Sequence, residues 1–194
     1  MTDKPVPLER RFEAVSQDID ETQQADYLEM MSYGKPIGWP EIDARYRTVI
    51  LAAGGAGKTF ELEARAKYLD AQDRHSFFIR IEDIDSDFEN AFEIGDAAKF
   101  EKWRSSSGEA WFFLDSVDEA RLSHPRAFEK ALRAFETKIA DANDRAHICI
   151  SSRPYAWQPR RDFALVDQLF PSVNLKQEPT GQDVDPSDDA VTED

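Results

Sequence analysis

The sequence has little cysteine and no long apolar run. Its one cysteine, Cys149, cannot form an internal disulfide and lies within a short apolar run, so we expect a small buried core residue. No run approaches the roughly 18 apolar residues of a membrane span, and the opening residues MTDKPVPLERR lack the apolar stretch of a secretory signal. The sequence therefore predicts a soluble, cytoplasmic protein with no membrane contact.

Positive charge is also scarce. The chain has 24 Lys and Arg residues against 39 Asp and Glu, which gives a formal net charge of −15. Nucleic acids and anionic lipids are bound through clustered Lys and Arg, so this balance argues against a nucleic-acid partner. One local basic cluster is present in the sequence, at Arg153, Arg160 and Arg161. The three histidines are scattered and give no Cys/His spacing typical of a zinc site.

Short apolar runs alternate with helix-like segments from residue 48 onward. Helical spacing of apolar residues covers residues 58–71 and 128–139. Strands that alternate with helices indicate βαβ units, and hence a parallel sheet with helices on both faces. We therefore predict an α/β fold with a mostly parallel sheet over residues 41–177. The predicted strands are residues 48–52, 76–81, 110–114 and 146–150, with a weak fifth strand at 173–175.

The two ends of the sequence differ from this core. Apolar residues at positions 8, 12, 15 and 19 recur at helical spacing, so we expect residues 1–40 to form short helices that pack on the core or on a partner. Residues 178–194 contain seven acidic residues and almost nothing apolar. Such a composition does not offset the entropy lost on ordering, and it predicts a disordered acidic tail.

Residues 52–59, AAGGAGKT, match the Walker A pattern, with alanine at the first position where glycine is commoner. The glycines let the backbone curl so that N–H groups point at phosphate oxygens, and the helix that follows aims its N-terminus at the same place. In this pattern Lys58 reaches the β- and γ-phosphates, and the Thr59 hydroxyl coordinates Mg²⁺. The predicted residues for binding ATP or GTP are Gly54, Gly55, Ala56, Gly57, Lys58 and Thr59.

The apolar run at residues 110–114 ends in an acid, Asp115, and two more acids follow closely. An acid at the tip of a buried strand, downstream of a Walker A loop, is typical of the Walker B motif, in which Asp115 would hold Mg²⁺ through water. Asp118 and Glu119 lie just beyond, where a carboxylate can orient the attacking water. The sequence leaves open which of these two acids does so.

The run at residues 146–150 is followed by Ser-Ser-Arg-Pro and supplies a candidate contact for the γ-phosphate. In P-loop sheets the strand beside the phosphate-loop strand often delivers a polar or cationic side chain near that phosphate. Arg153 would then bond to the γ-phosphate or to neighbouring carboxylates. The alternative is a surface ion pair, for which so acidic a chain offers many partners.

Together these motifs resemble the NACHT-type NTPases of the STAND class, which are signal-transducing P-loop ATPases. The resemblance rests on VILAAGGAGKT, on WFFLDSVDEA with its small Ser116 directly after Asp115, and on ICISSRP. It covers roughly residues 36–177 and implies a P-loop NTPase three-layer sandwich. It also implies an ATP-driven switch that assembles as a homo-oligomer or with a partner protein. Bacterial members often serve in defence against phage.

Family members continue into a helical and winged-helix region and a long sensor array, so we expect this chain to be a fragment or to work with parts in another polypeptide. Our first hypothesis is therefore a STAND-like core that binds ATP and Mg²⁺ and hydrolyses ATP slowly. A second is an interaction module that binds nucleotide without turnover. A third is a small P-loop kinase, for which Arg160 and Arg161 are the only lid candidates and against which LDSVDE argues. A fourth, a nucleic-acid motor, is disfavoured by the net charge.

Overall fold

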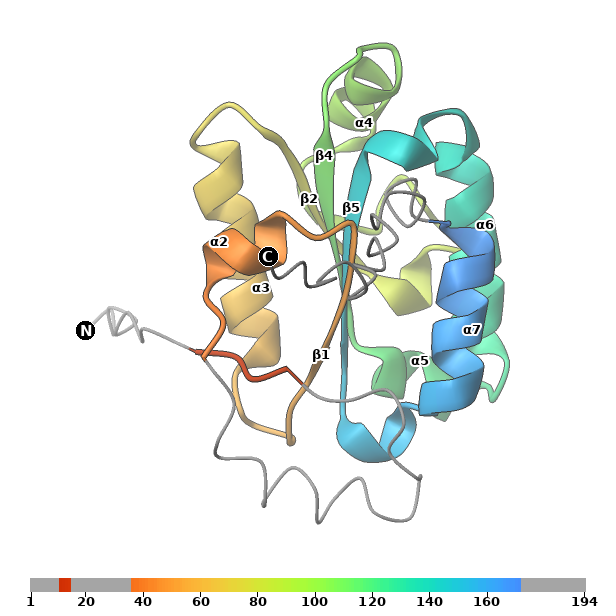
Figure 1. Ribbon diagram of the computed structural model, residues 1–194. Coiled ribbons are helices and arrows are strands. Elements are labelled where there is room, and N and C mark those ends of the chain that lie inside the picture. The colour runs from red at the N-terminus through yellow and green to blue at the C-terminus, as the bar shows by residue number, and fades with distance from the viewer. Residues whose placement is uncertain (1–10, 15–35, 172–194) are drawn as a thin grey trace, which may run out of the picture.

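The computed structural model describes residues 11–14 and 36–171, which contain a five-stranded sheet (Figure 1). Its strands are β1 (Arg47–Leu51), β2 (His75–Arg80), β3 (Phe92–Ile94), β4 (Ala110–Asp115) and β5 (Ala146–Ser152). Across the sheet they follow the order β1-β5-β4-β2-β3. Four strands run parallel, and β3 pairs antiparallel with β2 at one edge. The predicted α/β fold with a mostly parallel sheet is thus confirmed.

Helices lie on both faces of this sheet (Figure 1). On one face are α2 (Trp39–Asp43) and α3 (Lys58–Asp70). On the other are α5 (Val117–Ser123), α6 (Ala127–Ile139) and α7 (Pro159–Leu169). A further helix, α4 (Ala97–Arg104), precedes β4. Three short 3₁₀ helices connect these elements: η1 (Ile81–Asp83), η2 (Ala140–Arg145) and η3 (Pro154–Ala156).

The centre of the sheet is β4, whose side chains serve both faces. Trp111 and Phe113 belong to the apolar cluster on the α3 side, whereas Phe112 and Leu114 belong to the larger cluster on the α6 side. Successive side chains of a strand point to opposite faces, so a strand covered on both faces must be apolar throughout. This explains the unbroken apolar run that the sequence shows here.

Helix α6 confirms the helix predicted over residues 128–139. The residues that define its helical spacing, Phe128, Leu132, Phe135 and Ile139, are all buried against the sheet. Cys149 is also buried, as expected, and lies in the cluster on the α3 side.

Strand β1 places Ile50 in the apolar cluster on the α3 side and Val49 and Leu51 against the cluster on the other face, but it is less buried than the central strands. Strand β1 pairs with β5 alone within the described part of the chain, and of its five residues only Ile50 is buried. The physical reason is its position, because an edge strand has a neighbour on one side and receives less cover than a central strand. An apolar sequence does not by itself distinguish the two positions.

Strand β3 and helices α2, α4, α5 and α7 were not predicted. Strand β3 has three residues and owes its place to pairing with β2. Gly95, directly after it, has a φ of +81°, and a Cβ added there would lie 2.5 Å from Phe77 Cδ1. Glycine is therefore required at this close approach, which marks the end of the strand.

The structure describes residues 11–14 and 36–40 of the predicted helical segment over residues 1–40, and the helix expected from the spacing around Phe12 is not formed there. Residues 11–14 contain no helix, and Phe12 instead forms an isolated antiparallel bridge with Ile37. Helix α2 begins only at Trp39. Residues 1–10 and 15–35, the predicted strand at 173–175 and the predicted tail at 178–194 lie outside the described residues.

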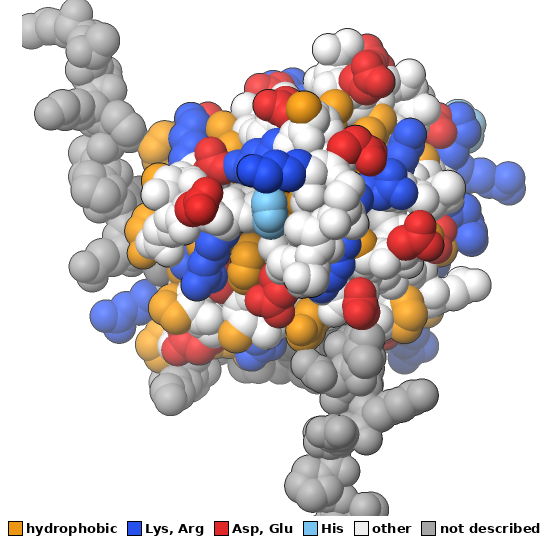
Figure 2. Space-filling model, turned by 90° about the horizontal axis from the view of Figure 1, so that it is seen from above, with side chains coloured by type: hydrophobic (Ala, Val, Ile, Leu, Met, Phe, Trp, Pro, Cys, Tyr) orange, Lys and Arg blue, Asp and Glu red, His pale blue; other side chains and the backbone are white. Residues whose placement is uncertain are grey.

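Charged side chains of both signs are interspersed over the face seen from above in Figure 2, so the described residues there form no continuous basic surface. A search of the described helices finds none with the length and apolar character needed to cross a membrane.

Candidate functional site

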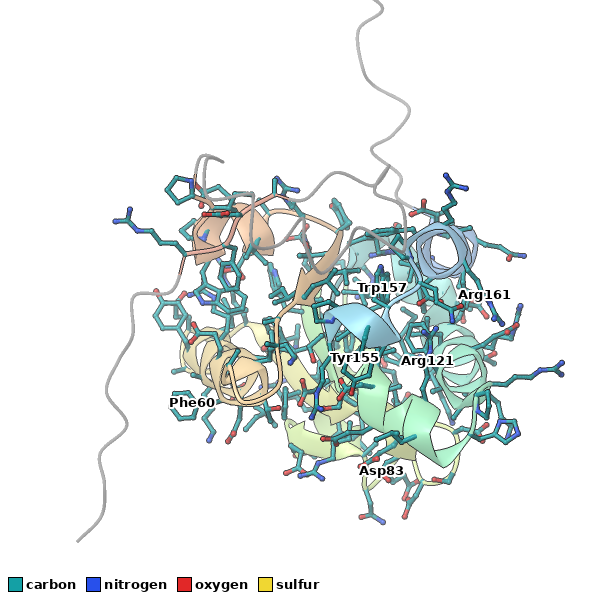
Figure 3. The ribbon with its side chains drawn as sticks, turned by 90° about the horizontal axis from the view of Figure 1, so that it is seen from below. Phe60, Asp83, Arg121, Tyr155, Trp157 and Arg161 are labelled. Carbon is teal, nitrogen blue, oxygen red and sulfur yellow. The ribbon has the colours of Figure 1, made fainter. Side chains whose placement is uncertain are left out.

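The candidate site lies at the carboxyl edge of the parallel strands, which is the edge seen from below in Figure 3. Strand β5 lies between β1 and β4, so the segments that follow these three strands emerge side by side. Those segments are the glycine-rich loop after β1, the acidic segment after β4 and the arginine after β5. The fold therefore brings together the three motifs that the sequence predicted to cooperate.

The glycine-rich loop joins β1 directly to α3. Gly55 and Gly57 have φ angles of +75° and +80°, values that a residue without a Cβ adopts at little cost. Gly57 precedes the first residue of α3, and its carbonyl accepts the Glu61 N–H at 3.0 Å. An α-helix gives the N–H groups of its first turn no acceptor within the helix, and in α3 this turn directly follows the loop, as an anion site at a helix N-terminus requires.

Lys58 is half-buried and folds back over the loop. Its Nζ donates to the carbonyl oxygens of Ala52 at 2.8 Å and Ala53 at 3.3 Å. Burial lowers the pKa of the Lys58 amino group, and the carboxylate of Asp118 acts in the opposite direction. The ammonium group is thus held at the mouth of the loop rather than extended into solvent.

Thr59 and Asp115 contact each other across the edge of the sheet. Thr59 Oγ1 donates to Asp115 Oδ2 at 2.7 Å, and Ser116 Oγ donates to the same oxygen at 3.1 Å. The other carboxylate oxygen accepts a short hydrogen bond from Ser151 Oγ, which itself accepts from the Ser116 N–H at 3.1 Å. Asp115 is only 4% exposed. Hydrogen bonds from three hydroxyl groups therefore stabilise its negative charge in place of bulk water. Ser151 was not predicted, because its role depends on β5 lying next to β4.

The oxygens of Thr59 and Asp115 fit a hard cation such as Mg²⁺. Within the described residues no group of three or more His, Cys, Asp or Glu side chains could hold a metal by itself. Mg²⁺ is commonly held by one or two protein oxygens together with substrate phosphates and water, so an all-protein cage is not needed. The two residues predicted as metal ligands therefore lie together in a suitable arrangement.

Ser116 has an unusual backbone conformation. Its φ and ψ are 70° and 58°, in the left-handed region that residues other than glycine seldom adopt. It links the end of β4 directly to the start of α5, and after this sharp turn Asp118 forms an ion pair with Arg153. The small side chain noted in the sequence is consistent with a left-handed residue here, because larger and β-branched side chains are most strained in it.

Arg153 contacts both the loop and one of the two candidate acids. Its Nε lies 2.8 Å from Asp118 Oδ2, and its Nη1 donates to the Tyr155 hydroxyl at 3.2 Å. A Cβ added to Gly54 would lie 3.4 Å from Arg153 Cζ, so the guanidinium lies against the glycine-rich loop. The Arg153 side chain is 37% exposed, whereas Asp118 is 4% exposed.

The remaining predicted residues are arranged less simply. Glu119 is exposed and lies one residue beyond the buried Asp118. Arg161, one of the basic residues near Arg153 in the sequence, lies on α7 at 3.6 Å from Glu129 of α6. Figure 3 shows Arg161 well apart from Tyr155, the residue to which Arg153 donates. Arg161 is close to Arg153 in the sequence, but η3 and the start of α7 lie between them.

Comparison of the chain with models of protein families, with characterised proteins and with solved structures finds no match.

Proposed function

We propose that this chain is the nucleotide-binding core of a P-loop NTPase of the NACHT-type STAND class, which binds ATP together with Mg²⁺. The observation that carries the proposal is the contact between Thr59 and Asp115, at 2.7 Å, beside a glycine-rich loop that ends in Lys58. Thr59 and Asp115 come from two motifs far apart in the sequence, and the sequence predicted that both would bind the same Mg²⁺. A structural turn that happened to contain a lysine would not require this pairing.

Each residue of the site has a defined task in this proposal. The loop N–H groups of residues 54–59 and the Lys58 ammonium bind the phosphate oxygens. Thr59 and Asp115 orient the metal, which when bound neutralises charge on the phosphates. The guanidinium of Arg153, which lies against Gly54 of the loop, would contact the terminal phosphate of ATP.

The structure favours Glu119 over Asp118 as the residue that orients the attacking water. Asp118 is buried and engaged by Arg153, so its carboxylate is occupied by a charged partner. Glu119 is exposed and follows it on the first turn of α5. Slow hydrolysis fits this arrangement, because an exposed carboxylate is less firmly positioned than a buried one.

The ion pair between Asp118 and the partly exposed Arg153 also supports the second candidate, an interaction module without turnover. If both groups serve only to hold the two segments together, the site binds nucleotide and has no residue committed to hydrolysis. Single-turnover hydrolysis of γ-labelled ATP distinguishes the two candidates. We expect slow release of phosphate by the wild type and a further loss in Glu119→Gln; wild type without any release supports the module.

Nucleotide binding itself is tested with Lys58→Ala. Calorimetric titration of ATP with Mg²⁺ should give a measurable affinity for the wild type and none for the variant, because Lys58 contacts the phosphates directly. The control is Lys67→Ala, which removes a lysine from the same helix at an exposed pair with Glu63. Equal ATP affinity in wild type and Lys58→Ala would refute the site.

A further inference from the structure

We infer that Arg121 and Asp162 are positioning residues that hold Arg153 over the phosphate loop, so that selectivity for a triphosphate over a diphosphate depends on them. This inference rests on the proposed function and concerns two residues outside the three motifs. Neither residue touches the loop itself. Their role follows from the contacts of the connection between β5 and α7.

The Asp162 carboxylate is almost fully enclosed, with 1% of the residue exposed. Its Oδ1 accepts from Arg121 Nη2 at 2.6 Å, and its Oδ2 accepts the Gln158 N–H at 2.7 Å. Arg121 also donates through Nη1 to the carbonyl oxygen of Ala156 in a short hydrogen bond. One buried guanidinium–carboxylate pair therefore ties α5 to both η3 and the first turn of α7 (Figure 3).

The same connection carries Arg153. Residues 153–158 run from the end of β5 through η3 to the start of α7, and Arg153 is the first of them. On α5, Arg121 lies three residues after Asp118, which places the two side chains on neighbouring turns of one helix face. Helix α5 thus holds this connection at two points, through Asp118 to Arg153 and through Arg121 to Ala156 and Asp162.

The two points differ in burial, and this difference assigns their roles. The pair of Arg121 and Asp162 has side chains that are 18% and 1% exposed, so breaking it leaves an uncompensated buried charge. Arg153 is 37% exposed and bonds to the buried Asp118 through Nε, so the rest of its guanidinium can contact a phosphate oxygen while that ion pair is kept. The buried pair is therefore the fixed anchor, and Arg153 is the group that gains a contact when a triphosphate binds.

Two variants weaken this anchor to different degrees. Asp162→Asn keeps the shape of the side chain and removes its charge. Arg121→Lys keeps the charge, but a single ammonium group does not reproduce the planar fork that reaches two acceptors. The milder Arg121→Lys variant preserves a test if Asp162→Asn does not fold. The matched control is Arg133→Lys, at an exposed pair with Glu129 on α6.

The experiment measures the affinities for ATP and ADP of each variant by calorimetry, in the wild-type and the Arg153→Ala background. We expect ATP affinity to fall roughly 3- to 30-fold, as for residues that modulate a site indirectly, with ADP affinity unchanged. In the Arg153→Ala background the same substitutions should have no further effect on ATP. Equal losses for ATP and ADP, or a loss that persists without Arg153, would overturn the inference.

A second measurement does not depend on nucleotide. The Arg153 Nε–H group, held by Asp118, should give a resolved side-chain signal in ¹⁵N–¹H spectra of the wild type, and Asp162→Asn or Arg121→Lys should speed its exchange with water. An unchanged Arg153 signal in both variants refutes the positioning role. If wild type binds no nucleotide but this signal responds as expected, the proposed function fails and the positioning of Arg153 stands.

Discussion

Replacing Asp115 by Asn removes one negative charge from the proposed metal site and changes little else. The carboxylate is buried and accepts hydrogen bonds from the hydroxyls of Thr59, Ser116 and Ser151. Asn has the same shape, keeps one acceptor oxygen and presents an NH₂ donor in place of the other. A hydroxyl group rotates between donating and accepting, so the three neighbours adapt to the new pattern. We therefore expect Asp115→Asn to fold.

The stability cost of this substitution is modest. A hydrogen bond to a charged group contributes about 1.5–3 kcal/mol and a neutral one about 0.5–1.5 kcal/mol, so three bonds lose about 1 kcal/mol each. Relief of the desolvation of a buried charge offsets part of this loss. A net fall of about 2 kcal/mol in the free energy of unfolding lowers Tm by roughly 4–8 °C in a chain of this size.

The effect on nucleotide binding has opposite signs with and without metal. Two unit charges about 8 Å apart repel by about 2 kcal/mol at an effective dielectric constant of about 20. Removing the Asp115 charge should therefore strengthen binding of metal-free ATP by up to about 30-fold. With Mg²⁺ the variant should gain less affinity than the wild type, because the residue that orients the metal is gone.

The assay is calorimetric titration of ATP in EDTA and at increasing Mg²⁺, at fixed ionic strength. The control is Asp141→Asn, which makes the same change of net charge at an exposed position on η2. Superimposable Mg²⁺ curves for Asp115→Asn and wild type, or weaker binding of metal-free ATP by the variant, would refute the reasoning.

Three further predictions concern backbone strain, pH and the tail. Ser116→Gly should be about 1 kcal/mol more stable to urea than Ser116→Ala, since both lose the hydroxyl but only glycine is unstrained at a φ of 70°; equal stabilities would contradict the strain. Burial raises the pKa of the Cys149 thiol, so the folded chain keeps a proton that the unfolded chain loses. The free energy of unfolding should therefore fall as pH rises above about 9, and less so in Cys149→Ala, in urea titrations at several pH values. Deleting residues 178–194 removes seven acidic residues and should leave ATP affinity equal or slightly higher; a calorimetric loss of binding would show that the tail supports the site.

Local patterns were enough to predict much of the fold. The helix over residues 128–139 could be predicted because its apolar residues repeat with a period near 3.6, which indicates both a helix and the face that it buries. The strand at 110–114 could be predicted because a strand covered on both faces has no polar alternation. The phosphate loop was recognisable since its glycines, lysine and threonine are contiguous, so their geometry is set by the local backbone.

What depended on strand order could not be predicted in this way. Periodicity gives the face of an element but not its neighbours, so it did not place β1 at the edge or reveal the three-residue strand β3. Ser151 bonds to Asp115 only because β5 lies between β1 and β4. The ion pair of Arg121 and Asp162 joins helices that follow different strands, and no residue spacing in the sequence predicts it. The sequence by itself predicted which residues would hold a phosphate and a metal. The tertiary structure decided which side chains contact them, because those contacts join segments that only the packed sheet brings together.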